Sequence, residues 1–270
     1  MTDNPQSSDR DCLRLIQVTD CHLGAEPGEQ LLGMDTDESL LDVLTLLRST
    51  EAQADMVVAS GDIASAGAEP AYGRFLDYLD DYLDLPAAWL AGNHDLPQTM
   101  KAIEPGRIQS DYVELGDWQL ILLDSSVLGS EGGSLSAAEL QRLTDLLQTS
   151  NRHTLVFVHH QPVPMKCEWL DKYVIDNADQ FFAALQGHEQ VKAVVFGHVH
   201  QEFDEEHQGI RLLASPSTCI QFKPRLVDFA VDRKMPGYRW FNLYGDGSFE
   251  TEVVRIPEKD YGVDYDSPGY

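Results

Sequence analysis

Five short polar motifs contain most of the residues in this chain that could do chemistry, and each follows an apolar run with the length of a buried strand. Open sheets bind ligands at the carboxyl ends of their strands, so we expect these side chains to gather at one edge. Each motif alone would also fit an ordinary polar turn. Six of the nine histidines lie in the motifs, however, a concentration that random placement would not produce. In chain order the motif residues are Asp20 and His22, then Asp62, then Asn93, His94 and Asp95, then His159 and His160, and finally His198 and His200.

The segment Gly92–Asp95 places an amide, an imidazole and a carboxylate in three consecutive positions. It follows the apolar run 86–91, which predicts a buried strand, and precedes Leu96-Pro97, a pair that we expect to resist a helix. Three consecutive side chains that carry protons or bind metals are poorly suited to a core. This segment is therefore the first candidate for a functional site.

The motif residues together have the chemistry of metal ligands. Carboxylates, imidazoles and one neutral amide suit borderline divalent ions such as Fe, Mn, Zn or Co. On an extended backbone Asp20 and His22 point to the same side, and Gly61 permits the close backbone approach that a carboxylate of Asp62 needs to bridge two ions. Seven candidates are too many for one ion and fit two ions that share a carboxylate, an arrangement that clamps both oxygens of a phosphoryl displacement. The strand-end residues from which these ligands would come are Asp20, His22, Asp62, Asn93, His94, His159, His198 and His200.

The elements that must position these motifs alternate between strands and helices, which predicts an α/β fold. Helices are expected at 35–49, 69–83, 136–147 and 178–185, the first and third begun by capping boxes at Asp35 and Ser136. Strands are expected at 13–19, 55–59, 86–91, 154–158 and 191–196, with a hairpin over 112–124 that turns at 116–117. Further strands at 210–214, 239–244 and 249–254 should complete a second sheet.

Length and composition limit the classes of protein that this chain can belong to. We expect a flexible lead-in over 1–11 and one domain over 12–270. The net charge of -26, from 19 basic and 45 acidic residues, argues against a nucleic-acid or membrane-surface partner. No apolar run approaches membrane-spanning length, no signal core is evident, and none of the four cysteines forms a C-x-x-C pair. We therefore expect a cytoplasmic protein with free thiols.

The motifs D-x-H, G-D, G-N-H-D, H-H-x-P and G-H-x-H, in this order over residues 20–200, resemble those of the calcineurin-like metallophosphoesterase superfamily. Leu32-Gly33, His200-Gln201 and the segments 216–224 and 236–238 are similar to the CpdA-type branch of bacterial 3',5'-cyclic AMP phosphodiesterases (class III). The resemblance implies a four-layer αββα sandwich, in which helices flank two mixed sheets. Cys21 departs from the Thr or Ser of relatives, at a position that is not a ligand.

The resemblance also implies roles for the motif residues. Asp20, His22 and His200 would hold one ion, Asn93, His159 and His198 the other, and Asp62 would bridge them, while His160 would be a neighbour. Fe²⁺ or Mn²⁺ is expected first, with Zn²⁺ or Co²⁺ as alternatives. The nucleotide substrate would contact His22, Asp62, Asn93, His94 and His200.

The activity implied is hydrolysis of 3',5'-cyclic AMP to 5'-AMP, with a bridging hydroxide as nucleophile, which would lower intracellular cyclic AMP. His94 is the candidate general acid for O3', oriented by Asp95. The alternatives are a metallophosphoesterase that acts on another phosphodiester or nucleotide, and a non-catalytic scaffold on the same fold. The scaffold is disfavoured because all seven ligand candidates and His94 are present. The oligomeric state and the choice between cyclic AMP and cyclic GMP stay open.

Overall fold

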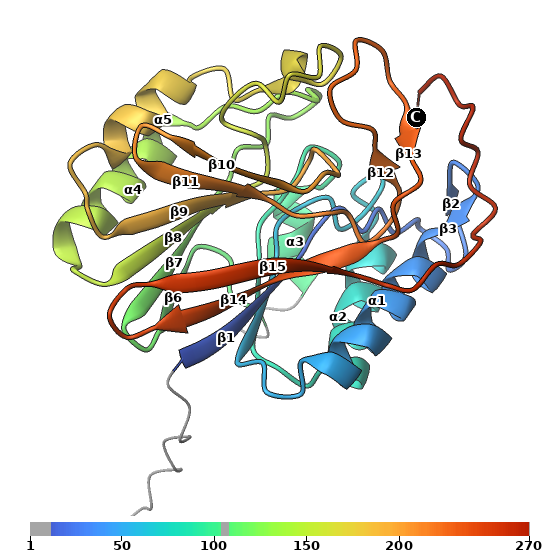
Figure 1. Ribbon diagram of the computed structural model, residues 1–270, viewed down its shortest axis with the longest axis horizontal. Helices are drawn as coiled ribbons and strands as arrows, with labels where there is room; N and C mark the ends of the chain where they lie inside the picture. The colour runs from blue at the N-terminus through green and yellow to red at the C-terminus, as the bar shows by residue number, and fades with distance from the viewer. Residues whose placement is uncertain (1–11, 104–107, 270) are drawn as a thin grey trace, which may run out of the picture.

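The structure, a computed structural model, describes residues 12–103 and 108–269, so the predicted lead-in over 1–11 lies outside the described residues. Two β-sheets pack face to face, and helices cover their outer faces (Figure 1). The first sheet has the order β15-β14-β1-β4-β5. Its strands are β1 (Cys12–Val18), β4 (Met56–Ala59) and β5 (Ala87–Trp89), which run parallel, and β14 (Gly237–Tyr244) and β15 (Phe249–Arg255), which add antiparallel pairs.

The second sheet has the order β10-β11-β9-β8-β7-β6. Its four central strands are parallel, and both edge strands are antiparallel to their neighbours. The strands are β6 (Tyr112–Leu115), β7 (Trp118–Leu123), β8 (His153–Val158), β9 (Val191–Phe196), β10 (Phe203–His207) and β11 (Ile210–Ala214). Both sheets are therefore mixed, and both present parallel strands whose carboxyl ends can meet.

The burial pattern of the strands produces the four layers. In β7, Leu120 and Leu122 pack between the two sheets, whereas Ile121 and Leu123 pack against the helices outside. The helices α1 (Thr36–Thr50) and α2 (Glu69–Tyr82) cover the first sheet, and α4 (Ala137–Thr149) and α5 (Ala178–Leu185) cover the second. This arrangement confirms the expected αββα sandwich.

The helix starts follow the capping chemistry of the sequence. Asp35 accepts a hydrogen bond of 2.9 Å from the backbone of Glu38, and Ser136 accepts one of 3.1 Å from Glu139. The expectation that Leu96-Pro97 resists a helix is wrong, because α3 (Pro97–Ile103) begins at that proline. A proline at the first helical position lacks only an N–H that would have no partner inside the helix, and its fixed φ suits the helix.

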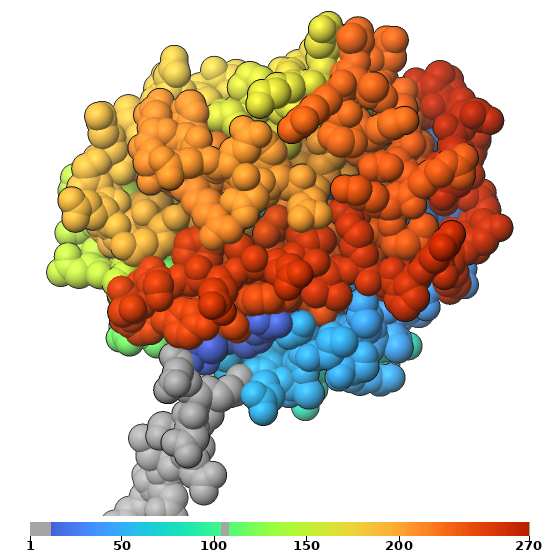
Figure 2. Space-filling view, in the orientation of Figure 1, coloured from blue at the N-terminus to red at the C-terminus, as the bar shows by residue number. Residues whose placement is uncertain are grey.

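The C-terminal strands divide between the two sheets. Only β11 joins the second sheet, whereas β14 and β15 return to the first, where β14 pairs with β1. The expectation that all three complete a second sheet is therefore wrong for the final hairpin. In Figure 2 this hairpin lies between the blue surface of the N-terminal helices and the orange surface above it. The sequence patterns did not predict several short elements: β2 (Gln30–Leu31), β3 (Met34–Asp35), β10, η1 (Asp171–Tyr173), β12 (Gln221–Phe222) and β13 (Val231–Asp232).

Two further properties concern membrane-spanning helices and the state of the cysteines. Within residues 12–103 and 108–269, none of the helices combines the length and the apolar character needed to cross a membrane. The four cysteines are free, and Cys21, Cys167 and Cys219 are buried.

Candidate metal centre

The five motifs meet at one edge of the sandwich, beyond the carboxyl ends of β1, β4, β5, β8 and β9. Three groups of side chains there have ligand atoms within 4.8 Å of one another. The side chain of His94 is half-buried, and the other members are buried. The groups are Asp20, His22 and His200; His22, Asp62 and His94; and Asp62, His159 and His198.

The first half of the centre joins Asp20, His22 and His200. Nε2 of His200 lies 3.3 Å from Oδ1 of Asp20 and 3.1 Å from Nε2 of His22. Atoms that share one ion at about 2.1 Å are separated by about 3–3.4 Å. These three side chains therefore fit the ligand set of one divalent ion.

The second half joins Asn93, His159 and His198. Oδ1 of Asn93 lies 3.2 Å from Nε2 of His159 and 2.9 Å from Nδ1 of His198. Oδ2 of Asp62 lies 3.2 Å from Nε2 of His159 and 3.8 Å from Nε2 of His22. A single carboxylate oxygen thus faces both halves, as expected of a bridging ligand.

Backbone carbonyls orient two of the imidazoles. Nδ1 of His159 lies 2.8 Å from the carbonyl oxygen of Ser60, and Nδ1 of His200 lies 2.8 Å from that of Ile220. A carbonyl oxygen only accepts hydrogen bonds, so both Nδ1 atoms carry a proton, and Nε2 is the atom of each ring that would bind a metal.

The pKa values of the buried carboxylates and imidazoles show that the centre favours bound positive charge. Burial opposes the charged form of Asp62, but His159 outweighs it and holds the pKa of this carboxyl well below its usual range. Burial likewise disfavours the charged form of His159, yet Asp62 raises the pKa of His159 to about 9. Burial lowers the pKa of His22 to about 3 and also lowers the pKa of His198. The raised pKa of His159 and the lowered pKa of Asp62 reflect their mutual attraction, and a divalent ion bound there would displace the proton of His159.

The backbone at the centre departs from the extended form that the sequence suggested. Among the described residues, ten that are not glycine have positive φ, and five of these are ligand candidates. Asp20 and His22 have φ of 55° and 50°, so their shared direction does not come from an extended strand as we expected. Side chains other than glycine adopt this region at a cost of order 1–3 kcal/mol each, and such residues cluster at functional sites.

Glycines allow the loops to approach one another closely. A Cβ on Gly61 would lie 2.3 Å from Nδ1 of His159, and one on Gly92 would lie 2.1 Å from Oδ1 of Asp62. A Cβ on Gly197 would lie 2.1 Å from Oγ1 of Thr19. Glycine is therefore required at these points for space around the ligands, as the sequence indicated for Gly61.

Asp95 and His94 have partners that differ from those expected. The Asp95 carboxylate accepts hydrogen bonds from the backbone of Ile63, Ala64 and Gly92, at 3.2, 3.0 and 2.9 Å. Nδ1 of His94 instead lies 3.0 Å from the carbonyl oxygen of Ser65. Asp95 thus joins the loops after β4 and β5, and the carbonyl of Ser65 takes the orienting position that we assigned to Asp95.

His160 lies beside the centre and outside the three ligand groups. Its Nδ1 lies 2.8 Å from Oγ of Ser125, and its ring centroid lies 4.8 Å from that of His198. This position agrees with the neighbouring role expected for it.

A buried amide below the centre was missed in the sequence. Gln17 on β1 is fully buried, and its Nε2 donates to Oγ of Ser60 at 2.7 Å and to the carbonyl of Phe196 at 3.2 Å. The hydroxyl of Ser215 donates to its Oε1. Gln17 thereby ties together the two sheets that supply the ligands, and a lone amide inside the apolar run 13–19 was the signal available in the sequence.

Two cavities adjoin the centre, and His94 and Asn93 line both. One has a volume of about 240 Å³ and an aromatic wall; the other has a volume of about 490 Å³ and a wall made mostly of loop residues. Substrate could therefore reach the ligand groups from either side of His94.

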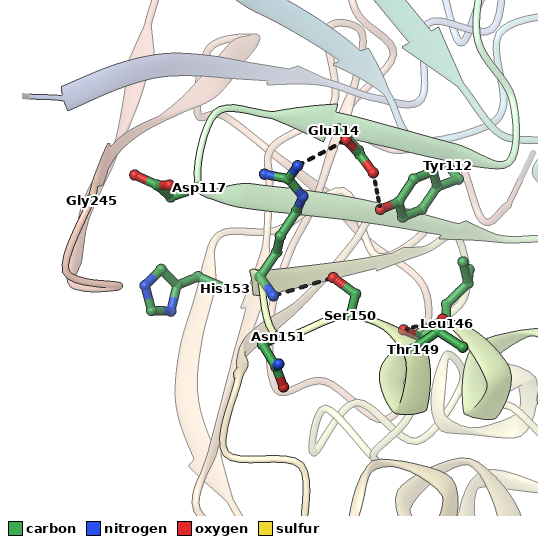
Figure 3. A pocket seen from close by; sticks show the side chains of 10 residues that line it. Tyr112, Glu114, Asp117, Leu146, Thr149, Ser150, Asn151, His153 and Gly245 are labelled. Carbon is green, nitrogen blue, oxygen red and sulfur yellow. Dashed lines mark hydrogen bonds and ion pairs between the residues drawn. The ribbon is translucent and has the colours of Figure 1, made fainter.

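A larger hollow of about 670 Å³ lies near the amino-terminal end of β8, between the β6–β7 hairpin and the end of α4 (Figure 3). Two of its charged groups form an ion pair. Arg152 lies 2.9 Å from Glu114, and the hydroxyl of Tyr112 donates to Glu114 at 3.1 Å. Because β8 separates this hollow from His159 by roughly 20 Å, it takes no part in the candidate centre.

The fold and the paired ligand groups together define a metallophosphoesterase of the αββα type. The sequence profile of the Calcineurin-like phosphoesterase family matches residues 13–202, and the chain belongs to this family. The 3',5'-cyclic adenosine monophosphate phosphodiesterase CpdA of Pseudomonas aeruginosa is 40% identical over 258 residues, which cover 95% of this chain and 94% of that relative. The CpdA of Escherichia coli K12 is 40% identical over 262 residues, which cover 96% and 95%. The crystal structure of a dimetal phosphatase from Danio rerio is similar in fold, with a TM-score of 0.62 at 17% identity, over 92% of this chain and 100% of that one.

Proposed function

We propose that this chain hydrolyses 3',5'-cyclic AMP to 5'-AMP at a centre of two divalent metal ions. The observation that carries the proposal is the position of Oδ2 of Asp62, 3.2 Å from His159 and 3.8 Å from His22, between two complete ligand groups. The near-full-length similarity to CpdA proteins supports the choice of substrate.

In this proposal Asp20, His22 and His200 would hold one ion, Asn93, His159 and His198 would hold the other, and Asp62 would contribute to both sites. The nitrogen and oxygen donors suit Fe²⁺ or Mn²⁺, with Zn²⁺ or Co²⁺ as alternatives. When bound, the two ions supply a nucleophilic water at neutral pH and neutralise charge on the phosphoryl oxygens.

His94 supplies the proton that the leaving group needs. Its Nδ1 donates to the carbonyl of Ser65, so Nε2 is the atom that delivers a proton to O3'. In the net reaction an oxygen of water would bond to phosphorus as the bond from phosphorus to O3' breaks; O3' would take its proton from His94, and the proton lost by the water would pass to solvent. The backbone N–H of His94 donates to Oδ1 of Asp62 at 2.9 Å, which holds the main chain of His94 beside the candidate bridging carboxylate.

The test is turnover by purified protein loaded with Fe(II) or Mn(II). We expect conversion of cyclic AMP to 5'-AMP, loss of activity on chelation, and recovery on return of the metal. A panel with cyclic GMP, bis(p-nitrophenyl) phosphate and p-nitrophenyl phosphate decides among substrates. Turnover of the aryl esters without cyclic AMP would favour another phosphoesterase, and a metal-loaded protein without any turnover would favour a scaffold.

We further propose that the protein is a single domain over 12–270 that works in the cytoplasm, where its four free cysteines stay reduced. Its substrate would be a small nucleotide. The net charge of -26 argues against nucleic acid or an anionic membrane as a partner.

A further inference from the structure

The aromatic cavity beside the metal centre has the size and the walls of a subsite. Its volume of about 240 Å³ is below the roughly 300–1,000 Å³ of pockets that hold whole drug-sized ligands. Its wall combines the centre residues Asn93, His94 and His198 with Trp169, Tyr173 and Phe229. The cavity therefore suits one part of a nucleotide whose phosphate lies at the centre.

Ring contacts attach this aromatic wall to a metal-ligand candidate. Phe222 stacks on His200, with ring centroids 4.0 Å apart and planes 6° apart. Trp169 meets Phe222 edge to face at 5.1 Å, and Phe229 meets Trp169 in the same way at 5.1 Å. Such arrangements are the favoured geometry of aromatic pairs. The distance from the indole to the centre is thus set by packed rings.

Backbone hydrogen bonds hold the two loops that carry these rings. Phe229 lies between β12 and β13, where the N–H of Lys223 donates to the carbonyl of Ala230 at 2.8 Å. The N–H of Glu168 donates to the carbonyl of Leu226 at 3.0 Å, which joins this loop to the residue before Trp169. The two rings therefore belong to one connected unit.

The cavity lining also includes polar groups that are held in place. Tyr173 packs edge-on against His198 at 6.2 Å. Its hydroxyl is hydrogen-bonded to the Glu131 carboxylate, and this bond, together with burial, raises the pKa of Tyr173. The cavity lining thus combines aromatic rings with hydrogen-bonding groups.

The second cavity lacks these features. Apart from the imidazole of His94, the described residues that line it contribute no aromatic ring. Its wall includes Ser65, Asp124 and the exposed side chain of Leu128. A planar base gains stacking energy from aromatic faces, so the two cavities differ in their suitability for a base.

We propose that Trp169 and Phe229 bind the base of the nucleotide, a proposal that rests on the nucleotide phosphoesterase function given above. The phosphodiester then lies at the ligand groups with O3' near His94. The aromatic cavity makes the protein select nucleotides over phosphodiesters that have no base. Stacking tolerates different bases, so the contact itself favours neither adenine nor guanine.

The test compares the binding of 5'-AMP and ribose 5-phosphate to Mn(II)-loaded protein, by calorimetry and by quenching of tryptophan fluorescence. We expect the wild type to prefer 5'-AMP by about 5- to 150-fold, the factor that corresponds to stacking of one base. Trp169→Ala should lose this preference and the associated quenching, and Trp169→Phe should recover most of the preference. Trp240→Ala is the matched control, because Trp240 lies on β14 against Arg14.

Equal affinity of the wild type for both compounds would overturn the base subsite, whatever the result with cyclic AMP. A preference for 5'-AMP without hydrolysis of cyclic AMP would uphold the subsite and contradict the proposed reaction. Steady-state kinetics provide a second measurement, since Trp169→Ala should raise KM for cyclic AMP by a larger factor than it lowers kcat. If Trp169→Ala fails to fold by circular dichroism, Phe229→Ala takes its place in both measurements.

Discussion

The backbone N–H of His94 donates a hydrogen bond of 2.9 Å to Oδ1 of Asp62, while Oδ2 of the same carboxylate faces the imidazoles of His22 and His159. The candidate acid and the candidate bridging ligand are thus joined through the main chain. Because the donor is a backbone group, the side chain of His94 can be removed without loss of this contact. The roles of the two residues can therefore be separated by substitution.

Asp62→Ala should reduce metal content more than His22→Ala does. Oδ2 of Asp62 faces both proposed ligand sets, whereas His22 belongs to the proposed set of one ion, with Asp20 and His200. We expect about two ions per chain in the wild type, about one in His22→Ala and fewer in Asp62→Ala. Metal analysis after gel filtration gives the ratio. Equal losses in the two variants would contradict the bridging role.

His94→Ala should keep both metals and lose turnover of cyclic AMP by about 10²–10⁴-fold, the usual contribution of a general acid. The effect should depend on the leaving group. The O3' alkoxide needs a proton, whereas the nitrophenolate of bis(p-nitrophenyl) phosphate leaves without one. Rates on both substrates, with metal content checked, provide the measurement. Equal losses on both would mean that His94 stabilises charge or positions substrate and is not the acid.

The sequence predicted the meeting of the five motifs because each motif follows a parallel strand, and the carboxyl ends of such strands share one edge. The left-handed φ values of Asp20 and His22 could not be predicted, since hydrogen bonds between loops impose them. The N–H of Asp20 donates to the carbonyl of Gly61, and the N–H of His22 donates to that of Asp62. These partners lie about forty residues away in the chain, beyond the reach of local patterns.

The orienting groups of the histidines were missed for a related reason. The carbonyls of Ser60, Ser65 and Ile220 act through the main chain, which every residue type possesses. The return of the C-terminal hairpin to the first sheet was also missed, because strand pairing over such a separation depends on tertiary packing and is not encoded in the period of the strands. Gln17 was the exception, because its amide side chain lies between the apolar residues Ile16 and Val18 in the sequence.

His160 should make metal-free protein sensitive to acid. Burial lowers the pKa of His160 to about 3, so between pH 6.5 and 3 the unfolded chain binds a proton that the folded chain excludes. The stability that neutral His160 contributes is present above pH 6.5 and is lost as pH falls, by about 1.4 kcal/mol per pH unit.

His160→Gln should therefore reduce the loss of unfolding free energy between pH 6.5 and 5 by about 2 kcal/mol. Urea unfolding of metal-free, chelator-treated protein at pH 6.5 and at pH 5 gives the change in unfolding free energy between the two pH values. An effect of the substitution that does not depend on pH cancels in this comparison. His207→Gln, on the edge strand β10, is the matched control. An unchanged pH dependence in His160→Gln would show that other groups cause the acid sensitivity.

Gly92→Ala should weaken metal binding although it alters no ligand. The added Cβ would lie 2.1 Å from Oδ1 and 2.5 Å from the backbone nitrogen of Asp62, so the carboxylate must move. Displacement of a group that supports a metal site typically costs about 10- to 100-fold in affinity or activity, and overpacking costs about 1–3 kcal/mol of stability. We expect losses of this size in Mn(II) titrations and in thermal unfolding.

Gly73→Ala is the control, because Gly73 lies inside α2 and a Cβ there meets no atom within 4 Å. In that helix alanine is favoured by about 1 kcal/mol, so the control should unfold at a higher temperature and keep its metal affinity. Unchanged metal affinity in Gly92→Ala would mean that the loop after β5 can shift without moving Asp62.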